Sequence, residues 1–352
     1  MQIQERDAIG EHTVKHRRCI IIAITLAVLL VLALTVTLTL GAVKLSIIEI
    51  GSIIVGKCSG SPQLYAGIPQ GLVAVIWELR LPRIISGMLC GAGLAVSGVI
   101  FQAILQNPLA DPYTLGISTG AAFGASFAIF LSVSTGMVLS VPFFALAFAA
   151  LTLVLVLLIA ARGGGMESGA LIMSGIIVSA ILSAGISFMK MLSGENVGAI
   201  VFWLMGSLSA RTWSDTALLM MIIPPASIGA AFFSAHLNIL ALGSRDAQAL
   251  GVQVKPTRFL YLLLAAGIIA ACVSVCGIIG FVGLIVPHLL RMSCTADNRV
   301  LIPLSALAGG LLLCMADNGA RLLGTGEIPV GVLTTLLGGP FFIFIFMSRR
   351  NR

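Results

Sequence analysis

Charged side chains are scarce in this chain. Only 9% of its 352 residues are Asp, Glu, Lys or Arg, whereas 59% are hydrophobic. Soluble domains carry about a quarter charged residues, because these residues cover the surface that faces water. The mean hydropathy of +1.11 points the same way. This composition excludes an ordinary soluble enzyme or binding module.

Sequence signatures of catalysis and metal binding are also missing. The chain contains no H-E-x-x-H, no G-x-S-x-G and no paired carboxylates within an apolar run. Its seven cysteines form no C-x-x-C pair. Cys272 and Cys276 would share a helix face, which a metal or redox pair would need, but no His or carboxylate accompanies them. We interpret them as small packing residues, and we expect no catalytic residue and no metal site.

Residues 51–60, GSIIVGKCSG, nearly match the phosphate-binding pattern G-x-x-x-x-G-K-[ST]. Gly51, Gly56 and Lys57 have the right spacing, but Cys58 replaces the hydroxyl residue that would hold Mg²⁺. No buried strand leads into the stretch. We instead expect a short amphipathic helix that ends at Gly56 and leaves Lys57 facing water, so this chain is not expected to bind ATP.

Long apolar runs take up most of the sequence. Each is about long enough to cross the roughly 30 Å hydrocarbon core of a bilayer. They predict an all-α polytopic membrane protein with about ten spans, at 19–42, 84–105, 116–135, 138–161, 169–190, 216–236, 257–276, 278–293, 300–318 and 329–347. The predicted organisation is one transmembrane domain, 19–347, between tails at 1–18 and 348–352. The first run is longer than a signal-peptide core, so we expect it to be retained.

The basic residues predict which side of the membrane each loop faces. With ten spans and a cytoplasmic N-terminus, seven of the 20 Lys and Arg residues lie outside and the other 13 lie inside. This bias favours cytoplasmic N- and C-termini. Trp77, Trp203 and Trp213 then lie near the outer interface, where aromatic belts occur. The net charge of +7 is scattered over short loops, which argues against nucleic-acid binding.

Arginines lie at the predicted outer ends of two spans. Arg80 and Arg83 precede the second span, and Arg321 follows the ninth. One interpretation is interfacial anchoring by snorkelling side chains. The other is a cationic patch for an acidic partner or substrate. Asp317, one helical turn before Arg321, is also placed for an intrahelical ion pair.

Two further polar segments lie at predicted inner ends of spans. The segment 97–122 carries Gln102, Gln106, Asn107 and Asp111 into a loop that two prolines force to turn. A lone Asp in such a loop is typical of a helix cap. His288 follows Pro287 near the inner end of another span. No second His or carboxylate shares its face, so we favour a structural hydrogen bond over a proton relay.

The longest predicted cytoplasmic loop, about 238–256, contains LALGSRDAQALGV. This stretch predicts a short amphipathic helix between glycine breaks, too polar to cross the membrane. Such a helix at the inner surface can dock a soluble partner in a groove. An interfacial helix without a partner explains the residues equally well.

Six segments together resemble the FecCD family of bacterial ABC-importer permeases. They are RLPR (80–83), SGVIFQAILQNPLADPYTLGISTGAA (97–122), GSLSARTW (206–213), LALGSRDAQALG (240–251), GIIGFVGLIVPHLLR (277–291) and EIPVGVLTTLLGGPFFIFI (327–345). They follow the family order over nearly the whole chain. Ala210 departs from the family pattern, in which Gly is common.

The resemblance implies a type II ABC-importer permease in the cytoplasmic membrane of a bacterium or archaeon. It implies a permease dimer, expected to be a homodimer, with two cytoplasmic ATPase subunits and an extracytoplasmic binding protein. ATP and Mg²⁺ would be bound by the ATPases, and no cofactor by this chain. The implied translocation path runs between the two permeases, lined largely by the fifth and tenth spans.

The resemblance also implies roles for individual residues. Arg80, Arg83 and Arg321 match positions that dock the binding protein. Other matches are ATPase coupling at Leu242, Gly243, Ala247, Leu250 and Gly251, a cytoplasmic gate near Ser168 and Gly169, and family-motif positions at Gln106, Asn107, Pro108, Asp111, Pro287, His288, Pro329 and Gly331.

The substrate expected from the resemblance is an iron–siderophore complex, with corrinoid and haem as alternatives. An ion-coupled secondary transporter is the alternative from another class. It would need buried carboxylates along its path, and spans three to six carry none well inside.

Overall fold

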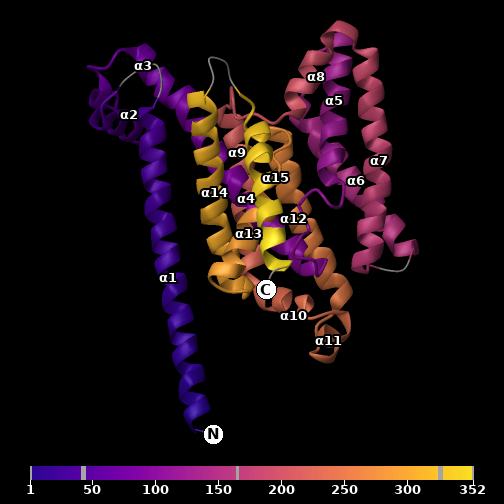
Figure 1. Cartoon of the computed structure of the whole chain (residues 1–352). Helices are drawn as coiled ribbons and strands as arrows, with labels where there is room; N and C mark the ends of the chain where they lie inside the picture. The colour runs from indigo at the N-terminus through magenta and orange to yellow at the C-terminus, as the bar shows by residue number, and fades with distance from the viewer. Residues whose placement is uncertain (1, 41–44, 164–165, 324–327, 351–352) are drawn as a thin grey trace.

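The computed structural model describes residues 2–40, 45–163, 166–323 and 328–350, and all regular secondary structure in these ranges is helical (Figure 1). Eight stretches are long and apolar enough to cross a membrane. They are the Arg17–Thr39 part of α1 (Gln2–Thr39), the continuous stretch Gln70–Ile104, α5 (Ile117–Thr135), α6 (Val141–Gly163), α7 (Ser168–Leu192), α9 (Trp213–Phe232), α12 (Val254–Cys276) and α14 (Asn298–Leu323). Two shorter apolar stretches, α13 (Val282–Ser293) and the Val330–Ile343 part of α15 (Val330–Arg350), occupy the other two predicted positions. The predicted all-helical polytopic fold is confirmed.

Short helices connect the long ones. The stretch Gln70–Ile104 consists of α3 (Gln70–Ala74), a π-helical turn, η2 (Val75–Arg80), and α4 (Leu81–Ile104). Pro82, which has no N–H to donate, is the second residue of α4, two residues after the end of the π-helical turn. The remaining short elements are α2 (Ile47–Ser59), η1 (Pro62–Tyr65), η3 (Gly194–Asn196), α8 (Val197–Leu204), α10 (Ser234–Ala241) and α11 (Ser244–Ala249).

Helix α4 lies at the centre of the bundle and contacts α9, α12, α13 and α14. Its glycines allow this close packing. A Cβ on Gly91 would lie 2.2 Å from the carbonyl oxygen of Gly309, and one on Gly98 would lie 1.9 Å from that of Gly283. Lipid tails are as apolar as leucine, so close contact between backbones is a main source of helix association.

The two ends of the bundle differ. Figure 1 shows the N-terminus, the C-terminus, α10 and α11 toward one end and α2 and α3 at the other. At the α2 end, the rings of Trp77 and Trp213 lie with centroids 5.0 Å apart, and Trp213 Nε1 donates to the Trp77 carbonyl at 2.9 Å. We call the first end the inner end and the second the outer end, following the predicted orientation.

The near match to a phosphate-binding loop is part of helix α2. Ser46 and Glu49 form a capping box at its start, and Gly60 in the left-handed conformation (φ 66°) ends it. The expected end at Gly56 is therefore wrong: Gly56 is buried within the helix, where a Cβ would meet the Tyr65 ring at 2.5 Å. Lys57 is exposed, as expected, and lies 5.9 Å from the Tyr65 ring centroid.

The eighth predicted span, 278–293, is helical only from Val282. Its twelve residues extend about 18 Å, less than a bilayer crossing. Residues 277–281 are not helical, and Gly277 (φ 71°) and Phe281 (φ 68°) adopt positive φ angles. The Tyr113 hydroxyl donates to the Ile279 carbonyl and accepts from its N–H at 3.0 Å. The Tyr113 side chain thus provides hydrogen-bond partners, from within the bundle, for backbone groups of the non-helical segment 277–281.

Candidate functional site

Three segments that the sequence assigned to separate roles meet at the inner end of the bundle. They enclose one open cavity of about 500 Å³. The lining comes from the end of α4, the start of α7 and the α10–α11 connection, and comprises Gln106, Glu167, Ser168, Gly169, Leu242, Gly243, Ser244, Arg245 and Asp246. The predicted gate region and the predicted coupling segment are therefore neighbours in space.

The predicted coupling segment forms a separate helix, α11, as the sequence indicated. Gly243 (φ 121°) and Gly251 (φ 82°) bracket it in conformations that residues with a Cβ rarely adopt. The Ala247 side chain is fully buried, whereas Leu242 and Leu250 are 62% and 60% exposed. The helix is therefore anchored by one small residue and presents two apolar side chains outward.

Polar contacts attach this segment to the bundle. Gln106 Nε2, just past α4, donates to the Leu240 carbonyl at 3.3 Å. The guanidinium of Arg258 on α12 donates to Ser244 Oγ at 3.2 Å and to the Met166 carbonyl. Arg258 thus connects α11 to the residues that precede α7. The sequence reasoning missed this role, although a lone Arg at the start of an apolar helix was a visible signal.

Ser168 is the first residue of α7, and its Oγ donates to the Ile104 carbonyl at the end of α4 at 3.2 Å. About two turns further along α7, a Cβ on Gly175 would lie 2.7 Å from the Thr114 carbonyl oxygen. The start of α7 is thus held against the loop that follows α4. Its role as a gate stays a prediction.

The loop between α4 and α5 turns tightly. Gln106 adopts a positive φ of 52°, and Asn107 Oδ1 accepts from the Leu109 N–H at 3.0 Å, beside the exposed Pro108. Asp111 Oδ1 accepts from the Tyr113 N–H at 3.1 Å. Asp111 therefore stabilises a turn, and the expected helix cap is wrong, because α5 begins after Gly116.

Burial raises the pKa of Asp111 to about 6, more than the hydrogen bond from the Tyr113 N–H lowers it. The carboxyl group lies outside the spans and is half-buried. Desolvation disfavours the charged form of a carboxyl group. Asp111 therefore titrates closer to neutral pH than an exposed aspartate.

The family-motif residues of α13 are buried in the bundle. Pro287 and His288 both lie inside, and on the same helix Arg291 donates to Gln102 Oε1 of α4. Gln102 Nε2 in turn donates to the Leu284 carbonyl at 3.3 Å. These side chains join α4 to α13.

Gly331 and Pro329 lie at the start of α15. The Gly331 N–H donates to the Gly206 carbonyl at 3.2 Å, and a Cβ there would lie 2.3 Å from the Met205 carbonyl oxygen. Only glycine fits this approach. The EIPVG stretch begins at residue 327, and residues 324–327 lie outside the described ranges.

The three predicted docking arginines cluster at the outer end, around the end of α1. Arg80 Nη1 donates to the Leu38 carbonyl at 2.5 Å, and Arg321 Nη2 donates to the Leu40 carbonyl at 3.2 Å. Arg83 pairs with Asp317 through two nitrogens at 2.8–3.2 Å. Asp317 thus bonds across helices to Arg83. Docking by these arginines stays a prediction.

Among the described residues, no group of three or more His, Cys, Asp and Glu is arranged to hold a metal ion. Cys272 and Cys276 are buried and free, and α4 adds a third thiol that the sequence did not connect with them. Cys90 Sγ lies 3.0 Å from Cys276 Sγ, and Cys272 Sγ donates to the Cys90 carbonyl at 3.7 Å. These thiols pack α4 against α12.

Known proteins share this architecture. The FecCD transport family model matches residues 28–348. A cobalamin import permease of Halobacterium salinarum, BtuC, is 40% identical and aligns over 82% of this chain and 78% of its own. The hemin permease HmuU of Yersinia pestis is 37% identical over 88% and 95%. A solved metal-chelate type ABC transporter in an inward-facing conformation is 34% identical, with a TM-score of 0.80 over 93% and 99%. This chain therefore belongs to the FecCD transport family and is an ABC-importer permease.

Proposed function

We propose that this chain is the membrane-spanning subunit of an ATP-driven importer for a metal chelate, with an iron–siderophore complex as the leading substrate. Corrinoid and haem are the alternatives. The names of the relatives include cobalamin, hemin, Fe(3+)-citrate and molybdate permeases. Membership of the family therefore does not by itself select one of these substrates.

The geometry of α11 carries the proposal. A short polar helix with one buried alanine and two exposed leucines is suited to fit into a groove on a soluble partner. In the proposed complex that partner is an ATPase subunit, with one ATPase on each of two identical permeases. The side chains that line the adjacent cavity connect α11 to the ends of α4 and α7.

These contacts suggest how ATP binding would reach the substrate path. Closure of the ATPases would move α11, and Gln106 and Arg258 would transmit that motion to α4 and to the start of α7. A ligand changes a conformational equilibrium only by its difference in affinity for the two states. ATP, held by the partner, would supply that difference.

At the outer end, the proposed partner is a binding protein that presents acidic residues to Arg80, Arg83 and Arg321. Complementary charge at a docking rim speeds encounter and orients the partner. Here the arginines are held in place by the carbonyls that end α1 and by Asp317. This arrangement supports a pre-oriented cationic surface.

Reconstitution in proteoliposomes tests the proposal. The permease is combined with an ATPase and a binding protein encoded beside it, and uptake of ferric siderophore, cobalamin, hemin and molybdate is measured. We expect uptake of one metal chelate that requires ATP and both partners. Uptake driven by a proton or sodium gradient, without the ATPase, would contradict the proposal and favour a secondary transporter.

A further inference from the structure

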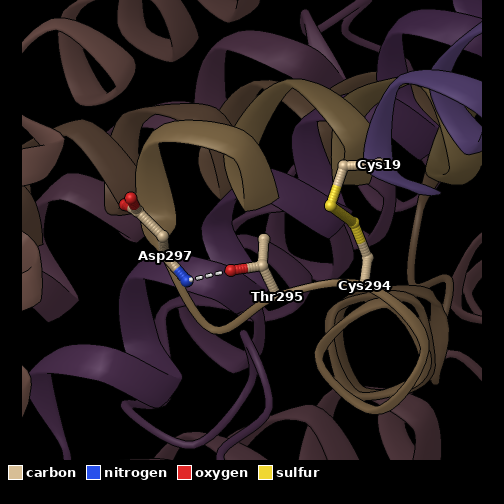
Figure 2. Close-up of a disulfide and its surroundings, with 4 residues drawn as sticks. All are labelled: Cys19, Cys294, Thr295 and Asp297. Carbon is tan, nitrogen blue, oxygen red and sulfur yellow. Dashed lines mark hydrogen bonds between the residues drawn. A yellow bond between two sulfur atoms is a disulfide. The ribbon is translucent and has the colours of Figure 1, made fainter. Parts of the chain in front are cut away.

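Two cysteines 275 residues apart in sequence are joined by a disulfide (Figure 2). Cys19 lies on α1, and Cys294 directly follows α13. Their Cα atoms are 5.5 Å apart, within the usual range for a disulfide. Neither residue belongs to a motif considered above.

The bond fixes a helix that is otherwise little buried. Only 11% of the apolar window of α1 is buried in the structure. Cys19 is buried, yet its neighbours Arg18 and Ile20 are exposed. At the far end of α1, Arg80 and Arg321 donate to the carbonyls of Leu38 and Leu40. The membrane-spanning part of α1, Arg17–Thr39, is therefore held by polar contacts at its outer end and by a covalent bond near its inner end.

The other half of the bond lies in a segment that contacts α10. Asn238 Nδ2 on α10 donates to Asp297 Oδ1 at 2.6 Å, and Asn238 Oδ1 accepts from the Asn298 N–H at 2.9 Å. Between Cys294 and these two hydrogen bonds of Asn238, the Asp297 N–H donates to Thr295 Oγ1 at 3.1 Å (Figure 2). The disulfide is thus linked through one short turn to α10.

Helix α10 leads directly into the coupling segment. It ends at Ala241, and the exposed Leu242 and then Gly243, with its positive φ of 121°, follow. Gln106 also holds this end of α10, through the Leu240 carbonyl. A restraint on the 294–298 turn therefore acts on the element that positions α11.

We propose that Cys19 and Cys294 form a redox modification site that restrains the coupling segment when it is oxidised. The proposal rests on the proposed orientation, in which this end of the bundle faces the cytoplasm. Glutathione and thioredoxin keep most cytosolic thiols reduced, and cytosolic disulfides in mesophiles are usually transient, catalytic or redox-sensing. The pair is a dithiol in a reducing cytosol and a disulfide under oxidising conditions.

The chemistry is thiol–disulfide exchange with a small-molecule disulfide as the oxidant. The thiolate of one cysteine attacks that disulfide, which forms a mixed disulfide and releases one small thiolate. The second cysteine, deprotonated, attacks the protein sulfur of the mixed disulfide and releases the other small thiolate. The protein thus gives up two electrons and two protons, and one small disulfide becomes two small thiols. An excess of small thiol reverses both steps.

Sidedness and reversibility are tested first. Right-side-out and inside-out membrane vesicles are first oxidised with a small-molecule disulfide, and their free thiols are blocked. The vesicles are then treated with a membrane-impermeant phosphine reductant, and the newly exposed thiols are counted by mass-tagged maleimide. We expect two additional thiols in inside-out vesicles only, and none in Cys19→Ser. Two additional thiols in right-side-out vesicles only would contradict both the orientation and this inference. No additional thiols in either preparation would contradict the inference alone.

The restraint is tested by hydrogen exchange of residues 234–251 in the purified full-length chain, with and without the reductant. We expect reduction to raise exchange of these amides several-fold in wild type and in the control Cys58→Ser, whose thiol is free and exposed. Cys19→Ser and Cys294→Ser should match reduced wild type and ignore the reductant. Equal exchange in both redox states would overturn the inference and leave the importer function untouched.

Discussion

Arg83 Nη2 on α4 lies 2.8 Å from Asp317 Oδ1 on α14, and the two side chains are 15% and 6% exposed. The guanidinium also donates through Nε at 3.0 Å, so the pair is bidentate. Two planar hydrogen bonds fix the geometry as well as the charge. This ion pair joins the central helix to its most extensive neighbour at the end where the predicted docking arginines gather.

Because of this ion pair, we expect each single substitution to destabilise the protein more than the double substitution does. Arg83→Met or Asp317→Leu alone should destabilise the protein by up to about 3 to 5 kcal/mol, because each removes one side of a largely buried ion pair. The double substitution should recover most of that loss. Thermal unfolding of the purified protein in detergent measures both, with Arg299→Ala, an exposed arginine on α14, as the control. A double variant as unstable as the single ones would contradict the prediction.

Glycine packing around α4 gives a second prediction. Gly98→Ala should destabilise the bundle by about 1 to 3 kcal/mol, because the added methyl group would overlap the Gly283 carbonyl at 1.9 Å. Gly267→Ala on α12 is the matched control, since nothing lies within 4 Å of a Cβ there. Yield of folded protein and unfolding temperature compare the two. Equal stability of both variants would show that α4 can shift away from α13 freely.

The coupling segment gives a third prediction. Leu242→Asp with Leu250→Asp should weaken co-purification of the ATPase partner, because the two exposed leucines would supply the apolar contacts of α11. Gly243→Pro with Ala247→Pro should break α11 and uncouple ATP hydrolysis from uptake. Ala161→Asp, an exposed residue near the end of α6, is the control for added charge. Full transport by the double-proline variant would contradict a coupling role.

The outer arginines give a fourth prediction. Arg321→Gln keeps a donor for the Leu40 carbonyl but removes the charge, so the permease should insert and fold normally while binding-protein affinity falls. The loss should be larger at low ionic strength, because salt screens the interaction. Lys57→Gln, an exposed residue of α2, is the control. Binding measured in proteoliposomes with unchanged affinity for Arg321→Gln would count against docking at this site.

Asp111 gives a fifth prediction, on pH. Its folded-state pKa of about 6 is above the unfolded value near 4, so the folded state binds the proton more tightly. The stability it contributes is complete below pH 4 and is lost as pH rises through 6. Asp111→Asn keeps the acceptor for the Tyr113 N–H and should remove this part of the pH dependence. Unfolding temperature measured from pH 4 to 8 for both proteins provides the comparison, and identical profiles would contradict it.

Local patterns in the sequence were enough to predict the positions of the apolar helices and of α11. Apolar runs placed all ten long or short apolar helices, because each run had to satisfy its own backbone in lipid. Glycines on both sides of SRDAQA predicted a separate short helix, and the structure contains it. The end of α2 was misplaced at Gly56, since glycine there serves close packing against Tyr65, a contact that lies outside the local pattern.

By itself, the sequence determined the membrane-spanning helices, the family and the segments that the family uses. Only the tertiary structure decided which side chains of those segments contact one another. Asp317 is one turn from Arg321 in sequence, and the approach of α14 to α4 brings it into a bidentate pair with Arg83. Arg258, Tyr113 and the Cys19–Cys294 bond act between residues 14 to 275 positions apart. Helical periodicity describes neighbours within one helix, whereas these contacts depend on how separate helices cross.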